Sequence, residues 1–282
     1  AKLHKRVPCR EPYKVPADTG VDKMIVAVNA EKRIKVYLNS VIAETSGAPG
    51  RFTAQIAIES GATTTEEVGA IVQASGFSLY DANKLTEFSY GKSPNIVDQA
   101  GLEKLAQEAA AKGEPIKRPS DGGAVKSVAF VQCAGQRDAS GKHLPYCSGF
   151  CCNTSIKQAM YFKDANPDVD TVVIYTDLRA PGNGEDFYRS AQAKGVTFTK
   201  GKVLSVEPTD KTLTVRFHDL ILDEDAAVQE ADLVVLATGQ VPNSGVNIDL
   251  TPEQQEKVEV KPISILNLNY RQGKDLPKLS HG

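Results

Sequence analysis

The apolar positions of the first eighty residues follow a pattern that is typical of β-strands. Residues 24–28 form a short apolar run, and residues 34–42 alternate β-branched with polar side chains. A Pro- and Gly-containing turn at 46–50 separates this segment from a second alternating stretch at 51–58, so the two are predicted to form a hairpin. Residues 68–76 are predicted to form another strand, which ends in a turn of small residues.

Later in the chain the pattern changes to buried strands that alternate with helices. A helix is predicted at 102–112, and the Pro- and Gly-rich stretch 115–123 after it is predicted to be a linker and a domain boundary. Residues 127–132 are continuously apolar, which is typical of a strand buried on both faces. The alternation that follows predicts a parallel α/β sheet. Its further strands are predicted at 171–176, 196–199, 202–206, 212–217 and 232–239, and its helices at 153–164 and 185–194.

Composition places the chain among ordinary globular proteins. With 282 residues it is long enough for about two domains. A net charge of −2 argues against a general nucleic-acid binder, and no apolar run approaches the ~20 residues of a membrane-spanning helix. The sequence starts at Ala1 without an initiator Met or a secretory signal and ends at Gly282 without an evident closing element. We therefore expect it to be a piece of a longer protein.

The most informative chemistry lies in the cysteines. Four of the five fall within twenty residues, at Cys133, Cys147, Cys151 and Cys152, while Cys9 stands alone. The odd count does not suggest a disulfide framework. The spacing matches neither the paired cysteines of a zinc finger nor the run of bacterial ferredoxins, yet four thiolates could hold one zinc ion or one iron–sulfur cluster. Buried, inert thiols are the alternative, and spacing alone leaves the choice open.

The position of these cysteines also argues against a pyridine nucleotide. In a nucleotide-binding βαβ unit, a Gly-rich turn joins the first strand to a helix whose N-terminus faces the phosphates. Here the strand 127–132 and the helix starting near 153 are separated by the cysteine-bearing loop, and no G-x-G-x-x-G occurs anywhere in the chain. Thiols thus stand where phosphates would bind.

A second feature is a pair of similar strand ends. One is Ala74-Ser75-Gly76, and the other is Ala237-Thr238-Gly239. Small residues at the end of a strand let the backbone approach a flat ligand closely. Each motif alone is weak, because strands often end in Gly, but two in this order are more specific.

Together these features resemble the flavoproteins of the disulfide-reductase type, which have two dinucleotide-binding domains. Within that class the chain resembles the A subunit of heterodisulfide reductase, and most of all the flavoprotein B subunits of the quinone-interacting membrane-bound oxidoreductase (Qmo) complexes of sulfate reducers. The segments that carry the resemblance are 1–8, 67–77, 128–137, 146–152 and 156–159. The family's N-terminal G-x-G-x-x-G unit is absent here and is expected just before Ala1.

This resemblance implies a fold class, cofactors and partners. It implies an α/β flavoprotein with a partial FAD-type domain at 1–118, an inserted domain at 119–245 and the start of a return to the FAD-type domain at 246–282. FAD is expected in the longer parent. The implied role is an oxidoreductase subunit that relays electrons between a quinone pool and adenylylsulfate reductase, in the cytoplasm and membrane-associated through partner subunits. The implied ligands of a 4Fe-4S cluster are Cys133, Cys147, Cys151 and Cys152, and the implied FAD contacts are Ala74, Ser75, Gly76, Thr238 and Gly239.

Two other classes of function compete with an electron-transfer subunit. A free-standing NAD(P)H-dependent disulfide reductase is disfavoured, because the chain has neither the Gly-rich loop nor a closely spaced pair of redox cysteines. A non-catalytic docking fragment is the third class. No catalytic residue is assigned. Asp177 is predicted to be structural, Cys9 to be a lone thiol that binds no metal, and His143 and His218 to be surface or loop residues without a carboxylate partner.

Overall fold

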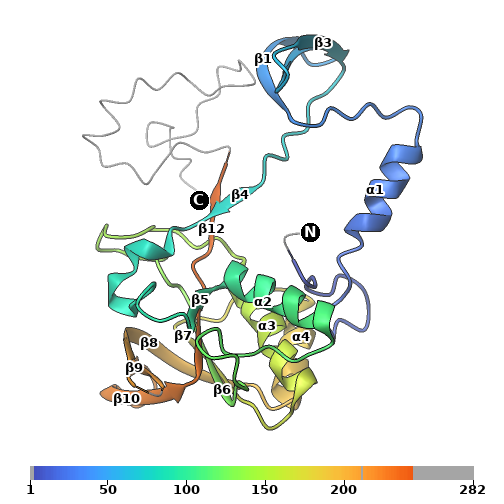
Figure 1. The fold of residues 1–282 in the computed structure, drawn as a ribbon. Helices are drawn as coiled ribbons and strands as arrows, with labels where there is room; N and C mark the ends of the chain where they lie inside the picture. The colour runs from blue at the N-terminus through green and yellow to red at the C-terminus, as the bar shows by residue number, and fades with distance from the viewer. Residues whose placement is uncertain (1–2, 211, 244–282) are drawn as a thin grey trace. The chain divides into compact units, whose positions relative to one another are not determined.

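The computed structural model describes residues 3–210 and 212–243, which fall into two compact units (Figure 1). The first unit contains residues 3–20 and 79–241, and the second contains residues 21–78 together with 242 and 243. None of the helices in these described ranges is long and apolar enough to cross a membrane.

A seven-stranded sheet forms the centre of the first unit. From one edge to the other its strands are β10 (Glu224–Ala231), β9 (Leu213–Asp219), β8 (Thr197–Pro208), β7 (Asp170–Tyr175), β6 (Ser127–Val131), β11 (Leu233–Leu236) and β5 (Ile96–Asp98). The five strands from β8 to β5 run parallel, and β9 and β10 extend the sheet antiparallel. The predicted α/β class with a parallel sheet is confirmed.

Both faces of this sheet are covered, as the apolar run of β6 requires. Val128 and Phe130 contact one hydrophobic core, which includes residues of α2 (Gln99–Lys112), α3 (Cys151–Ala165) and α4 (Gly184–Ala193). Ala129 and Val131 point to the other core, built with β8, β9 and the short 3-10 helices η1 (Ala82–Lys84) and η2 (Thr86–Phe88). The two-residue period of a strand thus divides β6 between two cores.

The order of the strands creates a special position at the carboxyl end of β6. The sheet continues through β7 and β8 on one side of β6, and through β11 and β5 on the other. In open parallel sheets, ligands bind outside the carboxyl ends of the strands where the winding reverses. Here that position is next to Gln132 and Cys133, which follow β6, and to Thr238 and Gly239, which follow β11.

The second unit contains one helix and a small antiparallel sheet. Helix α1 is followed by three strands paired in the order β1-β2-β3, with a tight turn between β1 and β2. A bulge between Ile42 and Glu44 shifts the register of β1 against β2. The bounds are α1 (Val21–Ala30), β1 (Ser40–Ala48), β2 (Arg51–Ile58) and β3 (Thr63–Val68). Two further short strands, β4 (Phe77–Leu79) and β12 (Gln240–Pro242), pair with each other.

Three of the elements predicted for this part of the chain are wrong. Residues 24–28 lie in helix α1, the first strand of the hairpin begins at Ser40 rather than at 34, and β3 ends at Val68, where a strand was expected to begin. A short apolar run has no periodicity that distinguishes a strand from a helix. Helix α1 buries none of its residues, so its pattern carries no signal of a core-facing side either.

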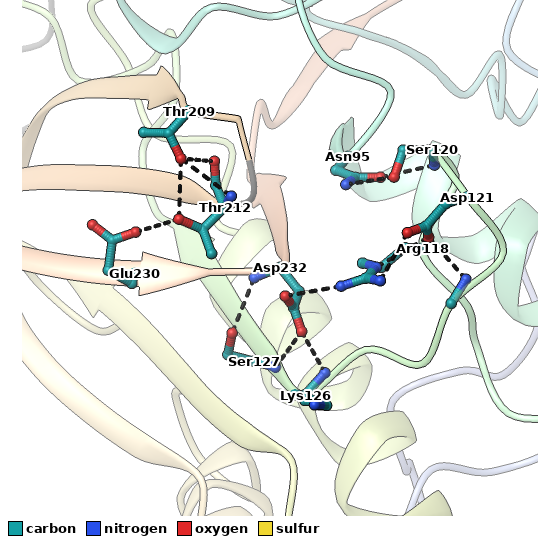
Figure 2. A network of polar contacts seen from close by, with 11 residues as sticks. Asn95, Arg118, Ser120, Asp121, Lys126, Ser127, Thr209, Thr212, Glu230 and Asp232 are labelled. Atoms are coloured by element: carbon teal, nitrogen blue, oxygen red, sulfur yellow. Dashed lines mark hydrogen bonds and ion pairs between the residues drawn. The ribbon is translucent and has the colours of Figure 1, made fainter.

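The segment expected to be a linker is bonded to the α/β sheet, as Figure 2 shows. The Asp232 carboxylate, at the start of β11, accepts hydrogen bonds from the backbone N–H groups of Lys126 (2.7 Å) and Ser127 (3.3 Å) and pairs with Arg118 (3.3 Å). The Asn95 and Ser120 side chains are bonded at 3.0 Å. These hydrogen bonds hold the segment against the α/β sheet, so it does not behave as a flexible linker.

The compact units therefore divide the chain at points other than 118 and 245. Strand β5 and helix α2 precede residue 118 and pack with the α/β sheet. The assignment of a FAD-type and an inserted domain stays a prediction, and residues 246–282 lie outside the described residues.

We predict that Asp232→Asn lowers the free energy of unfolding by about 2 kcal/mol, because a buried, charge-assisted acceptor for two backbone N–H groups and Arg118 is weakened. Urea unfolding followed by circular dichroism measures this change. Asp121→Asn is the matched control, since Asp121 pairs with the same arginine in solvent (2.8 Å). Equal effects of the two substitutions would contradict the role given to Asp232.

Candidate functional site

The four clustered cysteines line one cavity. Cys133 comes two residues after β6, Cys147 lies in the following loop, and Cys151 and Cys152 are the first two residues of α3. All four border the same cavity, together with Gln132, Arg137 and Arg179. Cys9 is exposed and is not among the residues that line it.

A strained turn after β6 places the first of these thiols. Cys133 and Arg137 both have a φ of +57°, which non-glycine residues adopt only where the surroundings hold them there. Gly135 between them has a φ of +79°, and a Cβ at this position would come within 2.4 Å of the Tyr80 ring. Only glycine fits this turn, which directs the chain from the strand end into the cysteine loop.

Backbone hydrogen bonds close the loop and bring Cys147 back to Cys133. The Arg137 N–H donates to the Tyr146 carbonyl, and the Asp138 N–H donates to the Leu144 carbonyl, both at 3.0 Å. These bonds bridge most of the thirteen residues between the two cysteines. Cys133 and Cys147 therefore line the same cavity, although thirteen residues separate them in the sequence.

The start of α3 places the other two thiols. Its first turn has no side-chain cap, so backbone N–H groups at this end of the helix are free to point at a ligand. The buried Gln99 of α2 donates from its amide to the Cys151 carbonyl (3.0 Å) and to the Ser155 hydroxyl (2.9 Å). Gln99 thus fixes the helix end that carries Cys151 and Cys152.

Burial and mutual repulsion disfavour the thiolate form of three of these cysteines, Cys133, Cys151 and Cys152. Burial raises the pKa of Cys151 to about 12, and it also raises the pKa of Cys133 and Cys152. A thiolate at Cys147 would raise the pKa of all three further, and a thiolate at Cys133 would raise the pKa of Cys151 and Cys152. Four thiolates therefore need a positive partner in this cavity.

The number and kind of donors at this cavity suit an iron–sulfur cluster. Within the described residues, no group of three or more His, Cys, Asp or Glu side chains could hold a single ion. A 4Fe-4S cluster takes one cysteine thiolate on each of its four irons, and four cysteines line this cavity. The side chain of Gln132, which is 8% exposed at the cavity, has both its amide nitrogen and its oxygen buried without a partner. Such orphaned groups indicate an occupant that accepts or donates hydrogen bonds.

Donors to the sulfur atoms are also in place. The Gly149 N–H donates to the Cys147 sulfur at 3.3 Å, and the Ser148 hydroxyl lies 3.6 Å from the Cys151 sulfur. Hydrogen bonds to ligating sulfurs are among the factors that set a cluster's potential. The loop therefore supplies both thiols and their polar neighbours.

The second small-residue motif contacts this cysteine loop. Thr238 and Gly239 are buried, and the place of a Cβ on Gly239 (φ +78°) is filled by the Gln136 side chain. Gln136 in turn accepts a hydrogen bond from the Ser148 N–H at 3.1 Å. The Thr238 hydroxyl is buried without a partner. Glycine at 239 thus makes room for a side chain of the cysteine loop.

The first small-residue motif, Ala74-Ser75-Gly76, lies in the second unit and is exposed. Gly76 has a φ of +72°. Asn243, four residues after Gly239, donates to the carbonyls of Ser75 (3.0 Å) and Gly76 (3.2 Å). The assignment of both motifs to FAD stays a prediction.

Two histidines have carboxylate partners that the sequence did not reveal. His143 lies 2.7 Å from the Tyr80 hydroxyl and 2.9 Å from Glu87, and it is half-buried rather than exposed. His218 lies 2.7 Å from Asp225. The expectation that neither has a carboxylate partner is wrong, because the partner of His143 lies 56 residues away and that of His218 on a neighbouring strand.

Sequence reasoning also missed polar residues around the thiols. Gln132, Gln136 and Arg137 were passed over, although each lies within four residues of Cys133. Asp177, predicted to be structural, pairs with Arg137 at 2.6 Å. The sequence signal for these polar residues is their position directly after a buried strand, where ligands bind in parallel sheets.

Two solved structures superpose on part of this chain. Ornithine N-hydroxylase of Kutzneria sp. 744 superposes with a TM-score of 0.44 at 15% identity, over 86% of this chain and 62% of that chain. The thioredoxin reductase of T. acidophilum superposes with a TM-score of 0.46 at 11% identity, over 86% and 65% of the two chains. No family model matches the sequence.

Curated relatives are A subunits of heterodisulfide reductases. The A subunit of the H(2):CoB-CoM heterodisulfide,ferredoxin reductase of Methanothermobacter marburgensis is 39% identical over 183 residues, which is 64% of this chain and 27% of that protein. The iron-sulfur A subunit 2 of the CoB-CoM heterodisulfide reductase of Methanopyrus kandleri is 37% identical over 187 residues, 65% of this chain and 28% of that protein. The aligned part thus spans about a quarter of each relative. The resemblance to these A subunits is confirmed over this stretch.

We predict that Gly135→Ala lowers the free energy of unfolding by about 2 to 3 kcal/mol, because a methyl group would overlap the Tyr80 ring in a left-handed turn. Gly141→Ala is the matched control in the same loop. It has a φ of +84° but nothing within 4 Å of its Cβ position, so only about 1 kcal/mol of backbone strain is expected. Denaturant unfolding of both variants measures the difference, and equal losses would contradict the tight packing at Gly135.

We also predict the order in which the thiols of the metal-free protein are alkylated. At pH 8 a thiol whose pKa is about 12 is thiolate in only about one molecule in ten thousand, so Cys151 reacts slowly with iodoacetamide. The exposed Cys9 reacts first. Peptide mass spectrometry follows the rates, with unfolded protein as the control in which all five react alike. Modification of Cys151 as fast as Cys9 in the folded protein would contradict its burial.

Proposed function

We propose that the chain is part of an oxidoreductase, an electron-transfer subunit of the heterodisulfide reductase A type, in which Cys133, Cys147, Cys151 and Cys152 hold a 4Fe-4S cluster. The observation that carries this proposal is that all four thiols line one cavity at the carboxyl end of β6 and the start of α3. The names of the homologous proteins, an iron–sulfur A subunit of a reductase among them, support the same class.

The chain's own residues would hold and shield such a cluster. The four thiolates would bind it, and Ser148 and Gly149, which contact the sulfurs of Cys151 and Cys147, would stabilise the ligands. Gln132 supplies a buried amide with no other partner. Burial on both faces of β6 excludes water from one side of the site. One electron at a time can then be held in a protected place.

FAD belongs to the same proposal, as a cofactor of the longer parent protein. A flavin exchanges electrons both in pairs and singly, so it links a two-electron donor to a one-electron cluster. The segments proposed to contact it are Ala74, Ser75 and Gly76 and the later pair Thr238 and Gly239. The bond network of Asn243 holds the first of these segments in place.

The proposed partners are other subunits of a membrane-bound redox complex. The sequence resemblance to the B subunit of the Qmo complex supports a relay between a quinone pool and adenylylsulfate reductase in sulfate respiration. Such a protein is cytoplasmic and reaches the membrane through its partners. In this role the chain passes electrons on and does not itself transform a substrate.

Iron and sulfide analysis of the anaerobically purified protein tests the cluster. We expect about four irons and four sulfides per chain, together with a broad visible absorption that bleaches on reduction. Cys147→Ser and Cys151→Ser are expected to lose most of the iron, because each removes one ligand. Cys9→Ser is the control and is expected to retain it.

Two results would contradict the cluster. One is zinc in place of iron, bound by the same cysteines. The other is a protein that stays free of iron after anaerobic reconstitution with iron and sulfide, with its circular dichroism intact. In the second case the thiols would have a structural or dithiol role.

The proposed acceptor has a separate test. The reduced protein, in its complex, is mixed with adenylylsulfate reductase, and the return of the oxidised cluster's absorbance is followed by stopped flow. We expect reoxidation to be faster than with an unrelated iron–sulfur enzyme at equal concentration. Equal rates would contradict adenylylsulfate reductase as the partner while leaving the cluster untouched.

A further inference from the structure

We propose that Arg137 raises the reduction potential of the cluster held by the four cysteines, with Asp177 and Thr176 fixing its guanidinium beside Cys133. This inference rests on the proposed function, since it concerns the same cavity. It adds a positioned cation that the set of ligands alone does not contain. The step concerned is the addition of one electron to the cluster, and no bond to Arg137 forms or breaks in it.

The geometry holds the guanidinium from several sides. Arg137 donates from one terminal nitrogen to the Thr176 hydroxyl (3.1 Å) and from the other to the Asp177 carboxylate (2.6 Å). Arg137 and Cys133 line the same cavity. The planar guanidinium with its five donors suits such simultaneous contacts, which a lysine ammonium cannot reproduce.

The backbone adds to this fixation. Arg137 adopts a left-handed φ of +57°, and its N–H is bonded to the Tyr146 carbonyl. Thr176 and Asp177 directly follow β7, whose carboxyl end lies beside that of β6. The anchors of the side chain are therefore parts of the rigid sheet. A residue held in strained backbone by such contacts is a candidate for a function at the site.

Charge gives the direction of the effect. Reduction adds one negative charge to the cluster, so a nearby positive charge and an N–H donor to a ligating sulfur stabilise the reduced state. Asp177 opposes this, but its side chain is 55% exposed and screened by solvent, whereas that of Arg137 is 28% exposed. Arg179 also borders the cavity and is exposed. Of the two cations at the cavity, Arg137 is the less exposed and the one whose guanidinium is fixed by two hydrogen bonds.

The test is a redox titration of the protein carrying its cluster, monitored by electron paramagnetic resonance with dithionite as reductant. In Arg137→Gln we expect a lower midpoint potential than in the wild type, with the same iron content. Arg137→Lys keeps the charge but cannot keep both the Thr176 and the Asp177 contacts that fix the guanidinium, so a smaller shift in the same direction is expected. The control, Arg189→Gln, removes the same charge from α4, away from the residues that line the cavity, and is expected to leave the potential unchanged.

The outcomes separate this inference from the proposed function. A wild-type protein without iron overturns the proposed function. A cluster-loaded Arg137→Gln protein with the wild-type potential, or with a shift no larger than that of Arg189→Gln, overturns only the inference. If Arg137→Gln does not hold a cluster, Arg137→Lys decides: a lowered potential supports the role of Arg137, and an unchanged or raised potential contradicts it.

Discussion

The crowding of four cysteine thiols around a single cavity is an electrostatic constraint on which the site depends. Burial raises the pKa of Cys151 to about 12, and every thiolate formed in the cavity would repel the others. Without a positive partner, burial favours the thiol form of Cys133, Cys151 and Cys152 over the thiolate that binds metal. With iron in the cavity the same burial becomes an advantage, because it strengthens the attraction between thiolates and metal and excludes water.

The rest of the first unit supplies what this constraint requires. A strained turn after β6 and a loop closed by backbone bonds bring Cys133 and Cys147 together, and Gln99 fixes the helix start that carries Cys151 and Cys152. At the opposite end of β6, Asp232 bonds the segment before this strand to the start of β11. Hydrogen bonds therefore fix the segments before and after β6, the strand that leads into the site.

The sequence was informative where one strong physical signal acts, and uninformative where partners are distant. The strand β6 could be predicted because burial on both faces leaves an uninterrupted apolar run, and the cysteines stood out by their number and spacing. That the cysteines meet at one cavity could not be predicted from the sequence. It depends on the hydrogen bond between Arg137 and Tyr146 and on Gln99 from another helix. The pairing of Arg137 with Asp177, forty residues apart, left no local pattern. The exposed helix α1 was mistaken for a strand because it buries nothing.

Diffraction from anaerobically grown crystals, measured on both sides of the iron absorption edge, shows whether the four cysteines bind iron. We expect one compact iron signal in the cavity at the carboxyl end of β6, within bonding distance of the sulfur atoms of Cys133, Cys147, Cys151 and Cys152. A cavity without iron in protein that was supplied with iron and sulfide, or an iron signal bound by other residues, would contradict it.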